Sequence, residues 1–292
     1  MSAPEYPRPG VVGDEGPYMP PPELPEVGES PPRWPAWYGP VALLAGLVAY
    51  AMILIVVEGV LRSAGASTKG AGAADVLTVL QDVVFVATAV GFASMTARPR
   101  PWHFGLRGRP LGRTALWTLV GMCSYLAFLL AYNFAFHPHG KQTVTKDLGA
   151  NNGTAALIGG ALVVIVVVPI CEELFFRGFF YRALRSRYNL WIAAAIDALV
   201  FGGVHYTGSG TLTVLPVLVA LGFVFCLVYE RTGTIYSTIA LHSLNNTVAY
   251  GSGTHHGGPV SAAVGAAMLA ALALAVVLTP PGGRARGSCR PV

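Results

Sequence analysis

Eight apolar stretches between Trp34 and Pro280 are the feature that most constrains the fold of this chain. Each stretch has about 17 to 26 residues, and a helix needs about 20 predominantly apolar residues to cross a bilayer. Only 11% of all residues are charged, whereas soluble domains carry about 25%. Helices satisfy their own backbone hydrogen bonds in lipid. The sequence therefore predicts an all-α, polytopic membrane protein with about eight transmembrane helices.

The hydropathy pattern divides the chain into three parts. The predicted spans are about 38–61, 74–96, 111–136, 155–180, 190–206, 212–229, 234–250 and 260–278. The fourth span is expected to continue as a helix towards Arg187. Residues 37–279 thus form one eight-helix membrane domain. Residues 1–36 precede it as a tail, and residues 280–292 follow it as a short basic tail.

The first tail has a composition unlike that of the rest of the chain. Twelve of the 22 prolines fall in the first 40 residues, and six of the 14 acidic residues precede Ser30. A segment of this kind buries too little apolar surface to offset the entropy of ordering, so we expect it to be disordered. A solvated tail is favoured over a segment that docks a partner through Pro20–Pro22.

The distribution of Lys and Arg predicts the orientation, because cytoplasmic loops carry an excess of these residues. If the N-terminus is cytoplasmic, 15 of the 19 Lys and Arg fall on that side, counting Arg113 and Arg177 at span ends. Both termini are therefore expected in the cytoplasm. The bias towards Ala, Val, Gly and Arg indicates a GC-rich bacterium, and hence its plasma membrane. No basic stripe is interleaved with aromatic residues, so we expect no nucleic-acid partner.

Two adjacent carboxylates, Glu172 and Glu173, follow directly on the apolar run 155–168. Carboxylates within a membrane segment are costly and mark functional sites by default. Neighbouring helical residues point about 100° apart, so the two cannot face the same site. Glu173 and Arg177 have the i,i+4 spacing that allows pairing on one helix face. This pairing would leave Glu172 as the free carboxylate.

Two further predicted helices bring polar groups to a similar depth. His205 follows Phe201 by four residues in the fifth span, and Asn246 follows His242 by four in the seventh. At 1.5 Å per residue, Glu172 and the three other polar residues lie about 12 to 20 Å from the inner ends of their helices. The sequence therefore predicts that Glu172, His205, His242 and Asn246 converge within the membrane.

This set of side chains has the chemistry of peptide hydrolysis. A carboxylate can deprotonate a water that a histidine orients, and a histidine with an asparagine can donate to an oxyanion. Two histidines and a glutamate are also a ligand set for catalytic zinc, with His205, His242 and Glu172 as ligands. No HExxH motif is present, so the zincin pattern does not apply. The metal-free and the zinc mechanisms both remain open at this point.

Three motifs in order resemble those of the CPBP family, the CAAX proteases and bacteriocin-processing enzymes also called Abi proteins. Glu172-Glu173-Leu-Phe-Phe-Arg177 resembles its EExxxR motif, Phe201-Gly-Gly-Val-His205 its FxxxH motif, and His242-Ser-Leu-Asn-Asn246 its HxxxN motif. The match covers about residues 155–250. Each motif alone is weak, whereas the ordered set on separate spans is specific.

The resemblance implies an intramembrane endopeptidase related to the type II CAAX prenyl proteases. It further implies that Glu172, His205, His242 and Asn246 line the active site, supported by Glu173, Arg177 and Phe201. The family is classed as metalloproteases, and a glutamate-dependent mechanism without metal is also proposed for it. The implied partners are the lipid bilayer and a membrane-associated protein or peptide substrate. Whether that substrate is lipidated, and the oligomeric state, stay open.

Two other classes of function compete with a protease. A transporter would also carry intramembrane acids, but it is expected to show two related halves with broken helices, and we find no internal repeat. A non-catalytic membrane scaffold is the other alternative, since family membership does not prove turnover. Asp82 and Asp197 are further acids within the apolar stretches. Asp82 is a candidate for lining a cavity. Asp197 is expected to pair with a cytoplasmic arginine, a role that we favour over tuning the site.

Overall fold

The computed structural model describes residues 31–65, 71–137, 153–206, 208, 211–254 and 257–281. These ranges are helical, with short connections and no strand. The all-α prediction is therefore confirmed for the described part of the chain. Residues 1–30 and 282–292, which make up most of the two predicted tails, lie outside the described residues.

All eight predicted spans are found as helical segments. Seven of them are single helices: α1 (Tyr38–Ser63), α2 (Ala71–Ser94), α3 (Leu111–Phe136), α8 (Leu190–Gly203), α9 (Leu215–Thr232), α10 (Ile235–Gly253) and α11 (Gly257–Leu278). A short 3₁₀ helix, η1 (Pro101–Phe104), lies between α2 and α3. The fourth span is a longer, composite helical run.

Six of the eight segments are long and apolar enough to cross a membrane. The two exceptions are α8, which has 14 residues, and α10, which has 19 residues. α8 ends at Gly203 rather than near Tyr206, and α10 carries polar side chains such as His242 and Asn246 along its length. α8 is apolar but short, whereas α10 is long enough but more polar; His242 lies on α10, and His205 lies two residues beyond the end of α8.

The fourth span is one helical run from Thr154 to Arg185. Its parts are α5 (Thr154–Leu162), η2 (Val163–Val167), α6 (Val168–Phe175), η3 (Phe176–Phe180) and α7 (Tyr181–Arg185). Both η2 and η3 are π-helical, a wide turn that is frequent at functional sites. Pro169 gives η2 a physical cause, because proline has no N–H and clashes with the carbonyl four residues before it.

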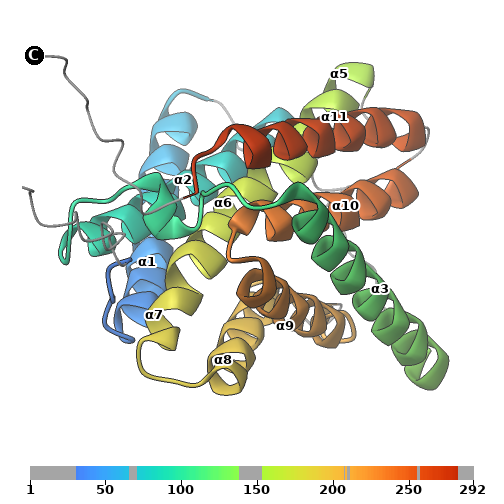
Figure 1. Cartoon of the computed structure of the whole chain (residues 1–292). Coiled ribbons are helices and arrows are strands. Elements are labelled where there is room, and N and C mark those ends of the chain that lie inside the picture. The colour runs from blue at the N-terminus through green and yellow to red at the C-terminus, as the bar shows by residue number, and fades with distance from the viewer. Residues whose placement is uncertain are drawn as a thin grey trace, which may run out of the picture.

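The composite run lies at the centre of the molecule. α2 packs against α6, and α10 packs against both η2 and α6. Figure 1 shows α1 and α2 on one side of this run and α10 and α11 on the other, with α8 and α9 below it. The phenylalanines of the run are buried in the core, namely Phe175, Phe176, Phe179 and Phe180.

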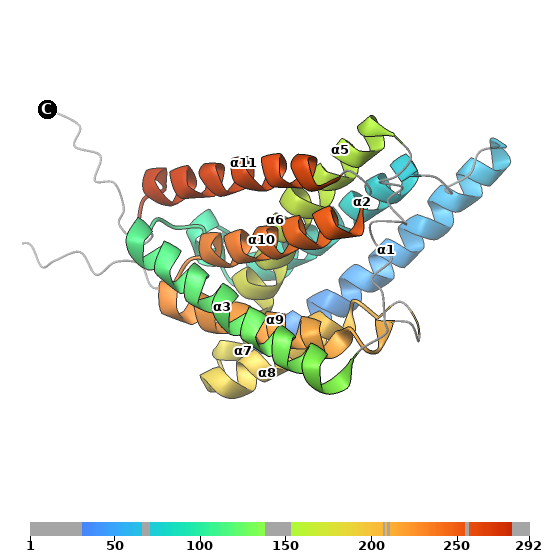
Figure 2. The ribbon, with the colours of Figure 1, turned by 90° about the vertical axis from the view of Figure 1, so that its right-hand side faces the viewer.

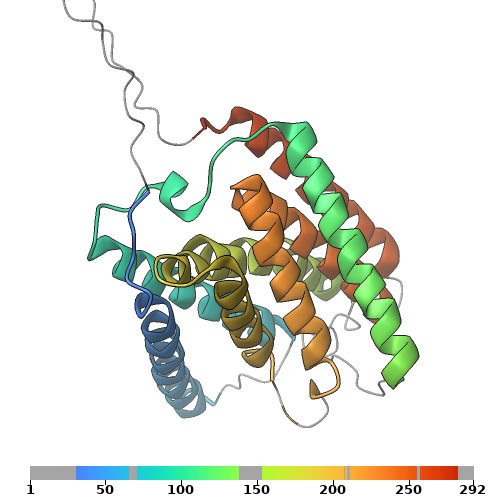
Figure 3. The same ribbon diagram turned by 60° about the horizontal axis from the view of Figure 1, so that its bottom comes forward.

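The remaining helices pack in pairs around this centre. α10 and α11 run side by side in Figure 2, and α3 lies beside α9 in Figure 3. Many apolar side chains on the outer helices are exposed, including Leu44, Ile55, Leu130 and Phe134. Such surfaces are expected on a protein whose surroundings are lipid. The buried polar side chains of the candidate site lie instead on the composite run or on helices that pack against it.

Candidate functional site

Glu172, on α6, lies between the two predicted histidines. His205 Nε2 lies 3.8 Å from Glu172 Oε1, and His242 Nε2 lies 3.9 Å from Glu172 Oε2. The exposed fractions of the three side chains are 13% for Glu172, 5% for His242 and 30% for His205. The structure thus brings together three of the four predicted site residues. The site is most open beside His205, just beyond the end of α8.

The second ring nitrogen of each histidine is held by an acceptor. His242 Nδ1 lies 3.2 Å from Glu173 Oε1, and His205 Nδ1 lies 2.7 Å from the Phe201 carbonyl oxygen. A carbonyl oxygen and an ionised carboxylate only accept hydrogen bonds, so each Nδ1 carries a hydrogen. When neutral, both rings therefore present the lone pair of Nε2 towards Glu172.

The pairing expected between Glu173 and Arg177 is present and fully buried. Arg177 Nη1 donates to Glu173 Oε1 over 2.9 Å, and both side chains are 0% exposed. Arg177 Nη2 donates to the Gly222 carbonyl of α9 at 3.0 Å. The orientation argument counted Arg177 at the end of a span. In the structure it lies inside the protein, because Glu173 and the α9 carbonyl replace the water that a guanidinium otherwise requires.

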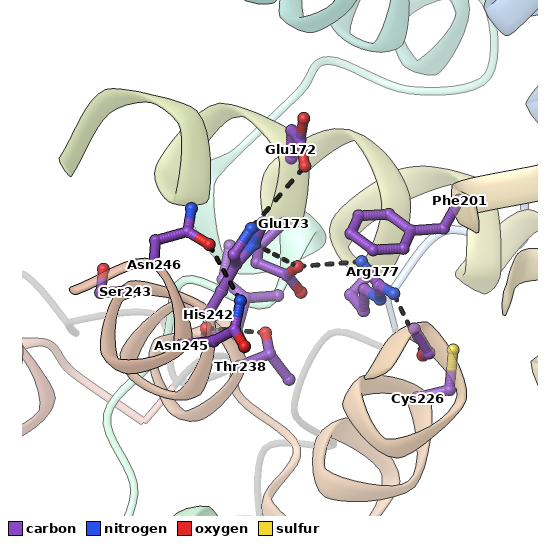
Figure 4. A network of polar contacts seen from close by, with 12 residues as sticks. Glu172, Glu173, Arg177, Phe201, Cys226, Thr238, His242, Ser243, Asn245 and Asn246 are labelled. Carbon is purple, nitrogen blue, oxygen red and sulfur yellow. Dashed lines mark hydrogen bonds and ion pairs between the residues drawn. The ribbon is translucent and has the colours of Figure 1, made fainter. Parts of the chain in front are cut away.

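Aromatic rings and a second acid complete the surroundings of Arg177. Its guanidinium carbon lies 4.4 Å from the ring centre of Phe201 and 4.7 Å from that of Phe225, a cation–π arrangement. Asp197 Oδ2 lies 3.5 Å from Arg177 Nε and accepts from Cys226 Sγ at 3.2 Å. Figure 4 shows the polar contacts from Glu172 through His242 and Glu173 to Arg177.

The sequence suggested only part of this network. Asp197 does pair with an arginine, but its partner is the fully buried Arg177 rather than a cytoplasmic residue. Phe225 and Cys226 were missed, because an aromatic residue and a cysteine in an apolar helix look the same whether or not they contact a charge. Cys226 meets Asp197 because α9 packs against α8, and Phe225 meets Arg177 because α9 packs against η3, which no local pattern encodes.

Asn246 is held by the composite run rather than by Glu172. Its Nδ2 donates to the Val164 carbonyl at 2.9 Å, and its Oδ1 accepts from Asn245 at 3.1 Å. Among the contacts of the described residues, none joins Asn246 to Glu172. One N–H of the Asn246 amide remains for another acceptor.

Ser243, three residues before Asn246, makes a related contact. Its hydroxyl donates to the Ile165 carbonyl at 2.7 Å. That carbonyl lies four residues before Pro169 and so lacks its normal helical donor. Neighbouring helices commonly supply such missing bonds in membrane proteins. The proline that widens η2 thereby creates the acceptors that align α10, and with it His242, on the composite run.

Asp82 approaches the site from a fourth segment, α2. It is 2% exposed, and its Oδ2 has no hydrogen-bond partner among the described residues. Three residues further along each helix, the rings of Phe85 and Phe175 lie 5.3 Å apart, which places Asp82 level with Glu172. The two carboxylates interact electrostatically. Asp82 was noted in the sequence as a candidate for lining a cavity, but its proximity to Glu172 was not foreseen.

The donor set can be compared with what a zinc ion requires. Two Nε2 lone pairs and a carboxylate are suitable ligands, and each Nδ1–H is held by an outer acceptor, as in many zinc sites. However, the described residues include no group of three or more His, Cys, Asp or Glu arranged to hold a metal ion. The residue types suit zinc, but their spacing in this structure does not, so we derive no step through a metal.

Part of the sequence matches a protein-family model. Residues 154–248, which run from α5 to most of α10, match the model described as type II CAAX prenyl endopeptidase Rce1-like. The matched segment includes Glu172, Glu173, Arg177 and both histidines.

Two curated proteins are also similar to the chain. The "Putative membrane peptidase YdiL" of Bacillus subtilis (strain 168) is 36% identical over 141 residues, covering 47% of this chain and 55% of that protein. The "Uncharacterized 24.3 kDa protein" of Escherichia coli is 31% identical over 83 residues, covering 28% of this chain and 38% of that protein. The chain thus spans about half the length of the first and less of the second. No solved structure matches it.

Proposed function

Through its segment 154–248 the chain is a member of the CAAX protease family, and from this premise we propose that it is an intramembrane endopeptidase that uses Glu172 to activate water. Its substrates would be membrane-associated or lipidated proteins or peptides. The observation that carries the proposal is the position of Glu172, with one histidine Nε2 at 3.8 Å from one oxygen and the other at 3.9 Å from the second.

Glu172 is the general base in this proposal. Glu173 is committed to Arg177 and His242, whereas Glu172 Oε2 is buried without a hydrogen-bond partner among the described residues. A water beside Glu172 would transfer a proton to the carboxylate as its oxygen attacks the scissile carbonyl carbon. The protonated Glu172 would then return the proton to the amine that leaves.

The histidine tautomers define what each ring can contribute. The neutral ring of His205 has its Nε2 lone pair towards Glu172, so it can accept the second hydrogen of the water and orient it. His242 can donate to a developing oxyanion from Nε2 only with a second proton on its ring. Its Nδ1 would stay hydrogen-bonded to Glu173 Oε1, 3.2 Å away, while Glu172 takes up the proton of the water. Asn246 would add its remaining N–H.

Zinc remains the competing mechanism, favoured by the ligand chemistry of the two histidines and Glu172. If zinc were bound, His205, His242 and Glu172 would hold it, and it would supply Lewis acidity. In that case the outer acceptors, Glu173 and the Phe201 carbonyl, would still orient both rings through Nδ1. The roles of Glu173 and Arg177 are therefore the same in either mechanism.

The membrane position of the site supports a substrate that is itself held at the membrane. His205 is the most exposed of the three central residues and follows the short helix α8. We propose that the substrate approaches beside His205, in the plasma membrane of a bacterium, with both termini of the chain in the cytoplasm. The distribution of Lys and Arg is what supports this orientation.

The proposal is tested by comparing new protein termini in membranes that contain the wild-type chain or its Glu172→Gln variant. We expect cleavage products that appear with wild type and are absent with Glu172→Gln. Glu58→Gln is the matched control, because Glu58 is exposed and pairs with Arg62 at the far end of α1. Identical termini in all three membranes would refute the protease and leave a transporter or scaffold as the function.

A further inference from the structure

Three arginines converge around Tyr229, near the end of α9. Arg107 and Arg109 lie in the connection before α3, and Arg182 lies on α7. A Cβ atom placed on Gly233 would stand 3.4 Å from Arg109 Nη2 and 3.8 Å from Arg107 Nη2, so both guanidinium groups lie against the same glycine. Arg182 interacts with the Tyr229 side chain and is repelled by Arg107. We call these three residues the Tyr229 arginine cluster.

The cluster brings like charges together without an acid among the described residues. Burial and then the neighbouring Arg107 lower the pKa of Arg109, and Arg113 acts in the same direction. The described ranges contain seven acids, which are Glu58, Asp75, Asp82, Glu172, Glu173, Asp197 and Glu230. Glu58 pairs with Arg62, and Glu230 pairs with Arg185. Among the described residues, no ion pair joins any of the other five to an arginine of the cluster.

Within the cluster, Arg182 has a guanidinium nitrogen that water does not reach. Its Nη1 is buried and has no hydrogen-bond partner among the described residues. The guanidinium lies 5.1 Å from the ring centre of Trp34, which holds it on one face. A buried guanidinium N–H without an acceptor is costly. An anionic oxygen between Arg182 and its two neighbours would satisfy this group and offset the repulsion within the cluster.

The location identifies where such an oxygen would come from. α3 begins at Leu111, α9 ends at Thr232 and α11 ends at Leu278, and all three are candidate membrane spans. Their ends meet here, since Gly108 N donates to the Pro280 carbonyl at 3.2 Å and Arg113 donates to the Arg231 carbonyl at 2.8 Å. Lipid headgroups lie at the ends of membrane spans. Guanidinium groups bind phosphate by bidentate hydrogen bonds.

We propose that Arg107, Arg109 and Arg182 bind the phosphate group of an anionic phospholipid at the membrane face where α3 begins and α9 and α11 end. The site is separate from Glu172 and does not depend on the proposed protease activity. The bound lipid would tie the connection 105–110 to α7 and α9, and so hold together segments that are distant in the sequence.

The test measures lipid binding by the full chain. Purified protein is stripped of lipid in a neutral detergent, and phosphatidylglycerol or phosphatidylcholine is titrated while bound lipid is counted by native mass spectrometry. Wild type should retain phosphatidylglycerol in preference. Arg109→Gln should weaken that binding by about five-fold, the factor expected for one arginine at an anionic membrane surface. Arg62→Gln, at an exposed pair with Glu58, is the matched control and should bind as wild type.

Arg109 is the informative position, because no hydrogen bond from its side chain to another described residue has to be broken. Circular dichroism confirms that Arg109→Gln is folded, and Arg109→Lys should restore part of the binding. Equal retention of both lipids by wild type would overturn the proposal. So would unchanged phosphatidylglycerol binding in Arg109→Gln, or stabilisation of wild type by inorganic phosphate alone. If Arg109→Gln binds phosphatidylglycerol as wild type does, but a protease cleaves its residues 1–30 faster than those of wild type, the cluster binds that acidic segment instead of a lipid.

Discussion

His242 and Glu173 are joined through Nδ1 and Oε1 at 3.2 Å, and the same carboxylate oxygen accepts from Arg177 at 2.9 Å. Glu173 therefore sets the tautomer of His242, whose Nε2 faces Glu172. It does so from a fully buried position, where its charge is balanced by a guanidinium. The same contacts thus balance the charge of Glu173 and orient His242 in the proposed active site.

Glu173→Gln tests that relationship. The amide is neutral, so it no longer balances Arg177 and no longer favours a hydrogen on His242 Nδ1 over the other tautomer. Loss of an outer partner of a functional histidine typically lowers activity by about 10- to 100-fold. We expect a loss of this size in kcat with an unchanged KM for a cleaved peptide. A larger effect on KM than on kcat would show that Glu173 contacts the substrate instead.

Arg177→Ala is expected to destabilise the protein. It leaves the carboxylates of Glu173 and Asp197 buried without their cation, and breaking a buried pair costs about 3–5 kcal/mol. The measurement is thermal unfolding in detergent, with Arg62→Ala as the control for an exposed pair. If Arg177→Ala abolishes activity while its Tm stays at the wild-type value, Arg177 has a direct catalytic role.

Ser243→Ala should destabilise the contact between α10 and the composite run. It leaves the Ile165 carbonyl without a donor, which costs about 1–3 kcal/mol for a buried group. Ser252→Ala is the control, because Ser252 makes the same kind of bond, to Ala249, at an exposed position of the same helix. Unfolding midpoints in denaturant would measure the difference between the two variants.

Pro169→Ala extends this test to the cause of the widened turn. An alanine at position 169 supplies the N–H that proline lacks, so the Ile165 carbonyl regains a donor within its own helix. The loss caused by Ser243→Ala should therefore be smaller in the Pro169→Ala background than in wild type. Additive effects of the two substitutions would show that they act on separate groups.

Metal dependence is decided by measuring metal content and turnover on the same sample after treatment with a strong chelator. The present spacing of the site leads us to expect turnover with well under one metal per chain. Loss of turnover that zinc alone restores would establish that the reaction needs zinc, for which His205, His242 and Glu172 are the expected ligands. Turnover by Glu172→Gln at the wild-type rate, with or without metal, would show that Glu172 is not the base.

The expected orientation is tested with single cysteines at positions 141 and 187, each compared with the unchanged chain to correct for its four native cysteines. Arg187 is exposed, just beyond the end of α7. An impermeant thiol reagent should label the cysteine at 141 in intact cells and the one at 187 only after the cells are opened. The reverse pattern would invert the topology.

The sequence alone determined the helical class, the approximate spans and three of the residues that meet at the centre, namely Glu172, His205 and His242. Apolar runs of membrane length allow few structures other than helices, because the backbone must satisfy itself in lipid. The spacing of Glu173 and Arg177 likewise determined their pairing, since both residues lie on one helix. These predictions rest on local patterns. The helix ends differ from the predicted ones by up to three residues, for example at the end of α8 (Gly203) and the start of α9 (Leu215), and the fourth run continues to Arg185 as expected.

The tertiary structure decided which groups surround those residues. Asp82 comes level with Glu172 only because α2 packs on α6, and Phe225 stacks on Arg177 only because α9 packs against η3. The link between Asn246 and Val164, in place of a direct contact with Glu172, likewise depends on how α10 lies on η2. Contacts between helices are set by the fit of whole surfaces. The sequence of one helix shows which of its residues share a face, but not which other helix packs against that face.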